Sequence, residues 1–130
     1  MPKPIGLVDG KLQPVPKTPN CVSTQAPEGD RQHRMEPWSF TVAADAVMAA
    51  LVQAVEALPR TTIVTRQPRY LHGVCKSQLI GFADDVEFLI DEAARQVHFR
   101  SASRVGYGDW GVNRKRMTAL AQALGSVLSR

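Results

Sequence analysis

Two stretches of the chain repeat apolar residues every three or four positions, which is the spacing of one face of an α-helix. The first covers residues 41–58, where Thr41 is the expected N-cap, Asp45 lies in the first turn and Pro59 ends the helix. The second covers residues 112–128, and its expected buried stripe consists of Met117, Leu120, Ala121, Leu124, Val127 and Leu128. The pattern therefore predicts two amphipathic helices that each bury one face.

The segment between these helices contains β-branched runs and alternating apolar and polar residues, both typical of strands. Residues 61–66 and 70–77 are the first two predicted strands, and residues 83–90 and 96–104 are the third and fourth. Short connections make neighbouring strands antiparallel. The sequence thus predicts an α+β fold of one helix, a four-stranded antiparallel sheet and a C-terminal helix, with both helices on one face of the sheet.

Residues 1–37 lack such periodicity and hold seven prolines. Because proline cannot continue a helix or donate a hydrogen bond within a central strand, this segment is expected to be an extended Pro-rich arm. Residues 38–130 are then expected to form a single α+β domain.

The composition is that of a small globular protein. The chain has 130 residues, of which 44% are hydrophobic and 22% are charged, and this length suffices to bury one core. It contains no apolar run of about 18 residues that would cross a membrane, and its first residues lack the apolar centre of a secretory leader. The sequence therefore predicts a soluble domain without a transmembrane segment, located in the cytoplasm.

The net charge of +4 is distributed in blocks. Residues 81–95 carry five acidic groups and one arginine, whereas residues 96–130 carry six basic groups and only Asp109. Adjacent blocks of opposite sign favour pairing within the fold. A nucleic-acid binder would instead keep a basic stripe free of carboxylates and interleaved with aromatic residues, so no nucleic-acid partner is predicted.

The two cysteines, Cys21 and Cys75, leave three interpretations open. They are two reduced thiols, one disulfide that ties the arm to the domain, or metal ligands. His33, His72 and His98 do not supply metal-ligand spacing with them. The sequence accordingly predicts no metal and no cofactor.

Strand alternation predicts a polar cluster on the third and fourth strands. If these strands form a hairpin with their apolar faces aligned, Asp85 and Glu87 lie across from His98, Arg100 and Arg104. Glu87 and Arg100 are the natural pair, because a guanidinium binds a carboxylate with two hydrogen bonds. The simplest interpretation is a ladder of salt bridges on an exposed face, worth ~0–1 kcal/mol per pair.

A second interpretation is an anion site at the start of the last helix. Arg114, Lys115 and Arg116 lie in its first turn, where the helix dipole disfavours cations. Their positive charges have to be balanced by the acidic block or by an anionic ligand. A glycine-rich loop that leads into a helix commonly binds an anion. In this interpretation the loop of residues 106–111 positions Asn113 as a cap, and the anion lies among Arg104, Arg114 and Arg116. The candidate ligand-binding residues are Arg100, Arg104, Asn113, Arg114 and Arg116, and the candidate structural polar cluster is Asn20, Asp84, Asp85, Glu87 and Asp109.

These residues favour a binding or structural accessory module for a small anionic ligand, and two other classes stay open. One is an enzyme that acts on a small substrate with Asp85 or Glu87 as base; no nucleophile motif accompanies them, and no catalytic residue is assigned. Asp84 and Asp85 are consecutive in a strand and therefore face opposite sides. The other class is a protein-interaction domain that uses the Pro-rich arm.

Several segments resemble the bacterial, cyanobacterial and plastid family known as domain of unknown function 1499. The segments are Pro19-Asn20-Cys21-Val22-Ser23, Tyr70-Leu71-His72 with Ser77, the run from Gly81 to Glu87, and the run RSASRVGYGDWGVNRKR from Arg100 to Arg116. The resemblance implies one compact domain and, because the family has no established activity, it assigns no catalytic residue. Its members often carry a membrane anchor or an export signal, which this sequence is not expected to contain. They also often carry a second arm cysteine near the position of Val15, where this sequence has a valine.

Overall fold

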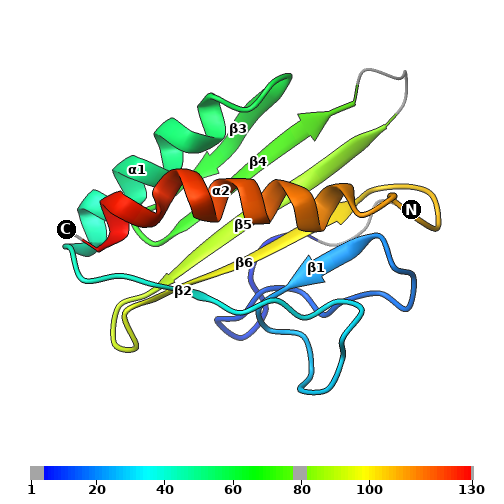
Figure 1. Cartoon of the computed structure of the whole chain (residues 1–130), viewed down its shortest axis with the longest axis horizontal. Coiled ribbons are helices and arrows are strands. Elements are labelled where there is room, and N and C mark those ends of the chain that lie inside the picture. The colour runs from blue at the N-terminus through cyan, green and yellow to red at the C-terminus, as the bar shows by residue number, and fades with distance from the viewer. Residues whose placement is uncertain (1–4, 78–81, 130) are drawn as a thin grey trace.

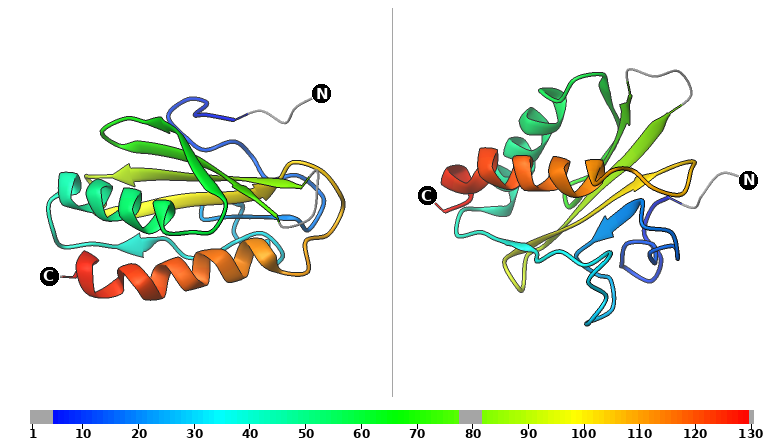
Figure 2. Two further views of the ribbon diagram at one scale, coloured as in Figure 1. Left: turned by 90° about the horizontal axis from the view of Figure 1, so that it is seen from above. Right: turned by 45° about the vertical axis from the view of Figure 1, so that its right-hand side comes forward.

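A six-stranded antiparallel sheet forms the centre of the molecule and separates two layers of different character. The computed structural model describes residues 5–77 and 82–129. Helices α1 (Ala44–Glu56) and α2 (Val112–Leu128) pack on one face of the sheet, and the N-terminal segment crosses the other face (Figures 1 and 2). The α+β class and the placement of both helices on one face are as the sequence predicted.

The sheet contains two strands more than the sequence predicted. Its order is β1-β6-β5-β4-β3, and β2 also pairs with β6. The strands are β1 (Cys21–Ser23), β2 (Trp38–Ser39), β3 (Thr61–Arg66), β4 (Tyr70–Lys76), β5 (Ala83–Asp91) and β6 (Gln96–Ser103). The four-strand prediction was wrong because β1 and β2 are too short to show alternation in the sequence.

The arm expected over residues 1–37 therefore supplies part of the sheet. No proline interrupts residues 20–26, so the backbone there is able to pair, and Val22 lies opposite Ser101 of β6. Trp38 lies opposite Val97 further along the same strand. Two short strands thus cover the outer edge of β6, which would otherwise present unpaired backbone groups.

Helix α1 is shorter than predicted, and its expected cap was wrong. The N-cap position is Ala43, whose side chain makes no capping hydrogen bond. Thr41 instead donates through its backbone N and its Oγ1 to the carbonyl of Leu128, at 2.8 and 3.4 Å. Thr41 therefore connects the entry of α1 to the end of α2, which the local sequence does not encode.

The hydrophobic core lies between the sheet and the helices. Trp38 packs with its ring centroid 4.6 Å from that of Phe99 and 6.1 Å from that of Phe88. The fully buried members of this core with less than 2% exposure are Val47, Leu51, Val55, Leu71, Val86, Phe88, Val97, Phe99 and Met117. Alternate residues of a strand face opposite sides. The residues of β4, β5 and β6 that alternate with these core residues therefore face the N-terminal segment.

Gly73 of β4 lies against Val55 of α1 and leaves no space for a larger side chain. A Cβ atom there would lie 3.2 Å from Val55 Cγ1 and 3.3 Å from Val86 Cγ2. We expect Gly73→Val to destabilise the protein by about 1–3 kcal/mol through overpacking. Gly125→Ala, in an open position of α2, should stabilise it by about 0.5–1 kcal/mol. Urea unfolding measures both, and a Gly73→Val protein as stable as the parent would contradict the packing.

Candidate functional site

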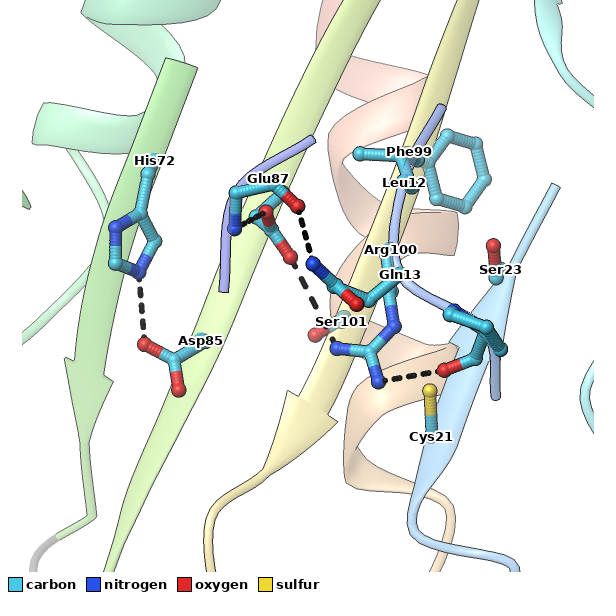
Figure 3. Close-up of polar contacts among 12 residues, drawn as sticks. Leu12, Gln13, Cys21, Ser23, His72, Asp85, Glu87, Phe99, Arg100 and Ser101 are labelled. Atoms are coloured by element: carbon cyan, nitrogen blue, oxygen red, sulfur yellow. Dashed lines mark hydrogen bonds and ion pairs between the residues drawn. The ribbon is translucent and has the colours of Figure 1, made fainter. Parts of the chain in front are cut away.

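A buried cluster of charged side chains occupies the face of the sheet that the N-terminal segment covers. Strand pairing builds it, because His72 of β4 lies opposite Glu87 of β5, and Glu87 lies opposite Arg100 of β6. Asp85 stands two residues from Glu87 on the same face (Figure 3). The predicted cross-strand pair of Glu87 and Arg100 is confirmed, with Arg100 Nη1 3.8 Å from Glu87 Oε1.

Glu87 is fully buried and held from three sides. Its Oε2 accepts hydrogen bonds from the Tyr70 hydroxyl at 2.5 Å and from the backbone N of Gly6 at 3.1 Å. Burial and the bond to Glu87 raise the pKa of Tyr70 well above its usual range. Among the described residues, Glu87 Oε1 and Arg100 Nε have no hydrogen-bond partner, so the charges of Glu87 and Arg100 face each other without a direct bond.

Asp85 is the most strongly bound carboxylate of the cluster. His72 Nε2 lies 2.7 Å from its Oδ1, and Arg104 binds both oxygens at 2.9 Å. Burial alone would raise the pKa of Asp85, but the bonds from His72 and Arg104 outweigh it and lower the pKa to about 2. Asp85 is therefore ionised at neutral pH and only a weak base.

The N-terminal segment covers this cluster, so the expectation of an exposed salt-bridge ladder was wrong. Arg100 Nη2 donates to the carbonyl of Pro14 at 3.1 Å, and Gln13 Nε2 donates to the carbonyl of Gly6 at 3.0 Å. The side chain of Leu12 is buried over the same face. These contacts leave Asp85, Glu87 and Arg100 at most 4% exposed.

His98 does not join the acidic residues, although alternation placed it on their face. It lies opposite Leu89, and its Nδ1 is 2.8 Å from the Thr24 hydroxyl. Burial lowers the pKa of His98, which favours the neutral imidazole. Tyr70 and His72 take part instead; the sequence pattern placed them in a strand but did not supply the register that brings them beside Glu87 and Asp85.

A second polar cluster lies on the helix face of the sheet, around Arg116. Its Nη2 binds Asp84 Oδ2 at 2.8 Å, and its Nη1 donates to Ser101 Oγ and Asn113 Oδ1 at 3.0 and 2.9 Å. The carboxylate of Asp84 therefore balances the charge of Arg116 in the first turn of α2. Consecutive residues Asp84 and Asp85 bind arginines on opposite faces of the sheet, as alternation requires.

Asn113 links the loop of residues 104–111 to the sheet. It is fully buried, and its Nδ2 donates to Ser103 Oγ, to the carbonyl of Asn20 and to Asp109 Oδ2. The expectation that Asn113 caps the helix was wrong, because Asp109 accepts the backbone N–H groups of Gly111 and Asn113. Burial alone would raise the pKa of Asp109, but the hydrogen bond from the Asn113 side chain and the backbone N–H groups of Asn113 and Gly111 together lower it.

Arg114 lies apart from both clusters. Its guanidinium donates to the backbone carbonyls of Arg31, Gln32 and Arg34 at 3.1–3.5 Å. The structure therefore does not gather Arg104, Arg114 and Arg116 around one anion: the sheet separates Arg104 from Arg116, and Arg114 holds the loop before β2. Helical spacing points Arg114 and Arg116 in different directions, which the run of basic residues concealed.

A pocket of about 360 Å³ opens where the strands meet the start of α2. Arg60, Lys76 and Arg116 line it together with Asp84, Thr61 and Ser77. Arg60 and Lys76 are bonded to each other: Lys76 N donates to the Arg60 carbonyl at 2.9 Å, and the guanidinium Nε of Arg60 donates to the Lys76 carbonyl at 3.1 Å. Sequence reasoning missed Arg60 and Lys76, because they are isolated in the chain and only strand pairing brings them beside Arg116.

In the described part of the chain neither Cys21 nor Cys75 forms a disulfide and both are buried, so the disulfide interpretation was wrong. Cys21 lies on β1, and Cys75 on β4 accepts a hydrogen bond from Thr61 Oγ1 at 3.2 Å. Across residues 5–77 and 82–129, no three histidine, cysteine or acidic side chains are grouped as metal ligands would be. None of the helices in this part of the chain has the length and apolar character needed to cross a membrane.

Comparison with known proteins identifies one family. Residues 11–124 match the model of the family described as "Protein of unknown function (DUF1499)". No curated protein and no solved structure matched the chain.

The bonds to Asp85 make stability depend on acid pH. We expect Asp85→Asn to lower the free energy of unfolding at neutral pH by about 2 kcal/mol, since the pKa falls from 3.8 to about 2 on folding. A lowered folded-state pKa stabilises the protein above the unfolded-state pKa. The difference between parent and variant should therefore shrink as the pH falls from about 4 to about 2.

Urea unfolding over this pH range measures the effect, with Glu28→Gln in an exposed loop as the control. A difference between parent and Asp85→Asn that stays constant from neutral pH to pH ~2 would show that the ionised Asp85 is not specially stabilised.

Proposed function

Because the chain belongs to the DUF1499 family, which carries no assigned activity, we propose its function from its own geometry: it is a binding module that takes a small anionic ligand in the pocket of Arg60, Lys76 and Arg116. One observation carries the proposal. Among the described residues, the exposed side chains of Arg60 and Lys76 form no ion pair, and they line one pocket together with Arg116, whose ion pair is with Asp84.

The charge balance of the pocket favours an anion. Three cationic side chains line it against one carboxylate, that of Asp84, which Arg116 already binds. Glu56, the acidic residue that precedes this stretch in α1, is not among the lining residues. The dipole of α2 adds positive potential, because Val112 at the start of the helix also lines the pocket.

The pocket also supplies hydrogen-bond donors for a small anion and enough volume to hold it. The side chains of Arg60 and Lys76 are exposed, with Arg60 Nε bound to the Lys76 carbonyl, whereas Arg116 is fixed by Asp84, Ser101 and Asn113. A fixed guanidinium beside two exposed cations suits a phosphate or carboxylate group. A volume of about 360 Å³ leaves room for such a group and a small organic part.

The arrangement supports binding better than catalysis by Asp85 or Glu87. A base acts best when its pKa lies near the operating pH, and the pKa of Asp85 is about 2. Glu87 is fully buried, with Tyr70 and the backbone of Gly6 on one oxygen. Both carboxylates hold the sheet and the N-terminal segment together.

Thermal unfolding with inorganic phosphate or citrate tests the proposal, against sodium chloride at the same ionic strength. A ligand that binds only the folded state adds about 2.7 kcal/mol at about a hundredfold excess over its dissociation constant. We therefore expect phosphate or citrate to raise the melting temperature of the parent protein. The double variant Arg60→Gln/Lys76→Gln should lose most of this increase.

Arg66→Gln is the matched control, since Arg66 is an exposed arginine at the other end of β3. It should respond to phosphate and citrate as the parent does. Equal responses of the parent and the Arg60→Gln/Lys76→Gln variant, or no response of the parent at millimolar anion, would refute the proposed site.

A further inference from the structure

Large apolar side chains are exposed at the end of the sheet where β6 leads into α2. Trp110 is 95% exposed, Tyr107 73% and Val105 51%. These residues lie on the loop between β6 and α2, which Figure 1 shows extending beyond the sheet. Phe82 and Val112, which are 49% and 44% exposed, belong to the same end, because Phe82 precedes β5 and Arg104 N donates to the carbonyl of Ala83.

The loop is anchored although its aromatic side chains are not. Asn20 Nδ2 donates to the carbonyl of Gly106 at 2.8 Å, and Asp109 accepts the N–H of Gly111 at 2.8 Å. Trp110 itself has a φ of 57°, in the left-handed region that bulky residues rarely adopt. Moving an indole from water into an apolar environment is strongly favourable, but the anchored backbone leaves the indole of Trp110 exposed to solvent.

Positive charge lies next to this apolar patch on the side of Val112. Val112 belongs both to the patch and to the lining of the pocket of Arg60, Lys76 and Arg116. Lys115 is exposed on the first turn of α2. The acidic side chains nearby are occupied: Arg116 binds Asp84, Arg104 binds Asp85, and Asp109 accepts bonds from Gly111 and Asn113.

We propose that this end of the molecule docks on the surface of a lipid bilayer that contains anionic phospholipids, with Trp110 and Tyr107 among the headgroups and a lipid phosphate in the pocket. The second half rests on the proposed function, because it names the source of the anion. Tryptophan and tyrosine are the side chains that favour the interface of a bilayer, and neighbouring cations strengthen binding to anionic lipids.

A bilayer fits this surface better than a protein partner does. A stable protein interface buries about 20–30 residues on each side around a closely packed apolar centre. The patch is instead a short projecting loop with a few apolar side chains and a cationic margin. Such a surface is able to enter the headgroup layer without a complementary partner surface.

Vesicle co-sedimentation of the full chain tests the proposal. We expect binding to vesicles of phosphatidylcholine and phosphatidylglycerol, weaker binding to vesicles of phosphatidylcholine alone, and further weakening in high salt. Trp110→Ala/Tyr107→Ser should lower the partition coefficient about tenfold or more. Val105→Ser should lower it less, and Val64→Ser, at a valine that is 58% exposed on β3, should leave it unchanged.

Tryptophan fluorescence provides a direct readout of insertion. The protein has two tryptophans, and Trp38 packs against Phe88 and Phe99. Anionic vesicles should shift the emission of the parent to shorter wavelength, and Trp110→Phe should abolish this shift. A shift that persists in Trp110→Phe would overturn the insertion of Trp110.

Further outcomes separate the two proposals. If phosphate stabilises the parent but anionic vesicles do not bind it, the docking inference fails and the anion pocket stands. If vesicles bind through Trp110 but Arg60→Gln/Lys76→Gln changes neither vesicle binding nor phosphate stabilisation, the pocket fails. Concentration-dependent dimerisation that Trp110→Ala abolishes, without vesicle binding, would assign the patch to a second copy and overturn the inference.

Discussion

The pairing of buried and half-buried carboxylates on both faces of β5 is the constraint on which the rest of the structure depends. A carboxylate taken out of water without a partner costs several kcal/mol. Asp84 meets this requirement with Arg116 of α2, whereas Asp85 and Glu87 meet it with Arg104, His72 and Arg100 on the other face. The ion pair of Asp84 and Arg116 thus attaches the sheet to the helix layer on one side. On the other side, Glu87 and Arg100 form hydrogen bonds with the backbone of the N-terminal segment.

The sequence predicted the parts of this arrangement that depend on periodicity. Residues 112–128 are helical as expected, and Glu87 and Arg100 lie on the same face of the sheet, as alternation along β5 and β6 predicted. It did not predict that β1 and β2 join the sheet, since strands of three and two residues are too short to show an alternating pattern. Short strands are held by the neighbour they pair with rather than by their own composition.

The candidate site shows the same division. Alternation correctly placed Asp84 and Asp85 on opposite faces, but the basic run of residues 114–116 suggested a single cluster that helical geometry divides between Arg114 and Arg116. Burial of Arg100 was not predictable, because it depends on the path of residues 6–14 over the sheet. The pocket cations Arg60 and Lys76 are neighbours only through the register of β3 and β4.

The run from Arg100 to Arg116 contains two kinds of residue. Ser101, Ser103, Asp109 and Asn113 bind one another and hold the loop and the helix to the sheet. Tyr107 and Trp110 are exposed on the loop that these bonds anchor. The fold therefore presents an aromatic loop on a firm base, next to cations that the internal ion pairs leave unmatched.

A double-mutant cycle on Glu87 and Arg100 tests most directly whether these buried pairs hold the structure. Glu87→Gln and Arg100→Gln should each lower the free energy of unfolding by about 3–5 kcal/mol, because each leaves its partner charge buried and unpaired. The double variant should lose clearly less than the sum of the two, with a coupling of about 1 kcal/mol or more. Additive losses would contradict the account, because Glu87 and Arg100 would then not stabilise each other.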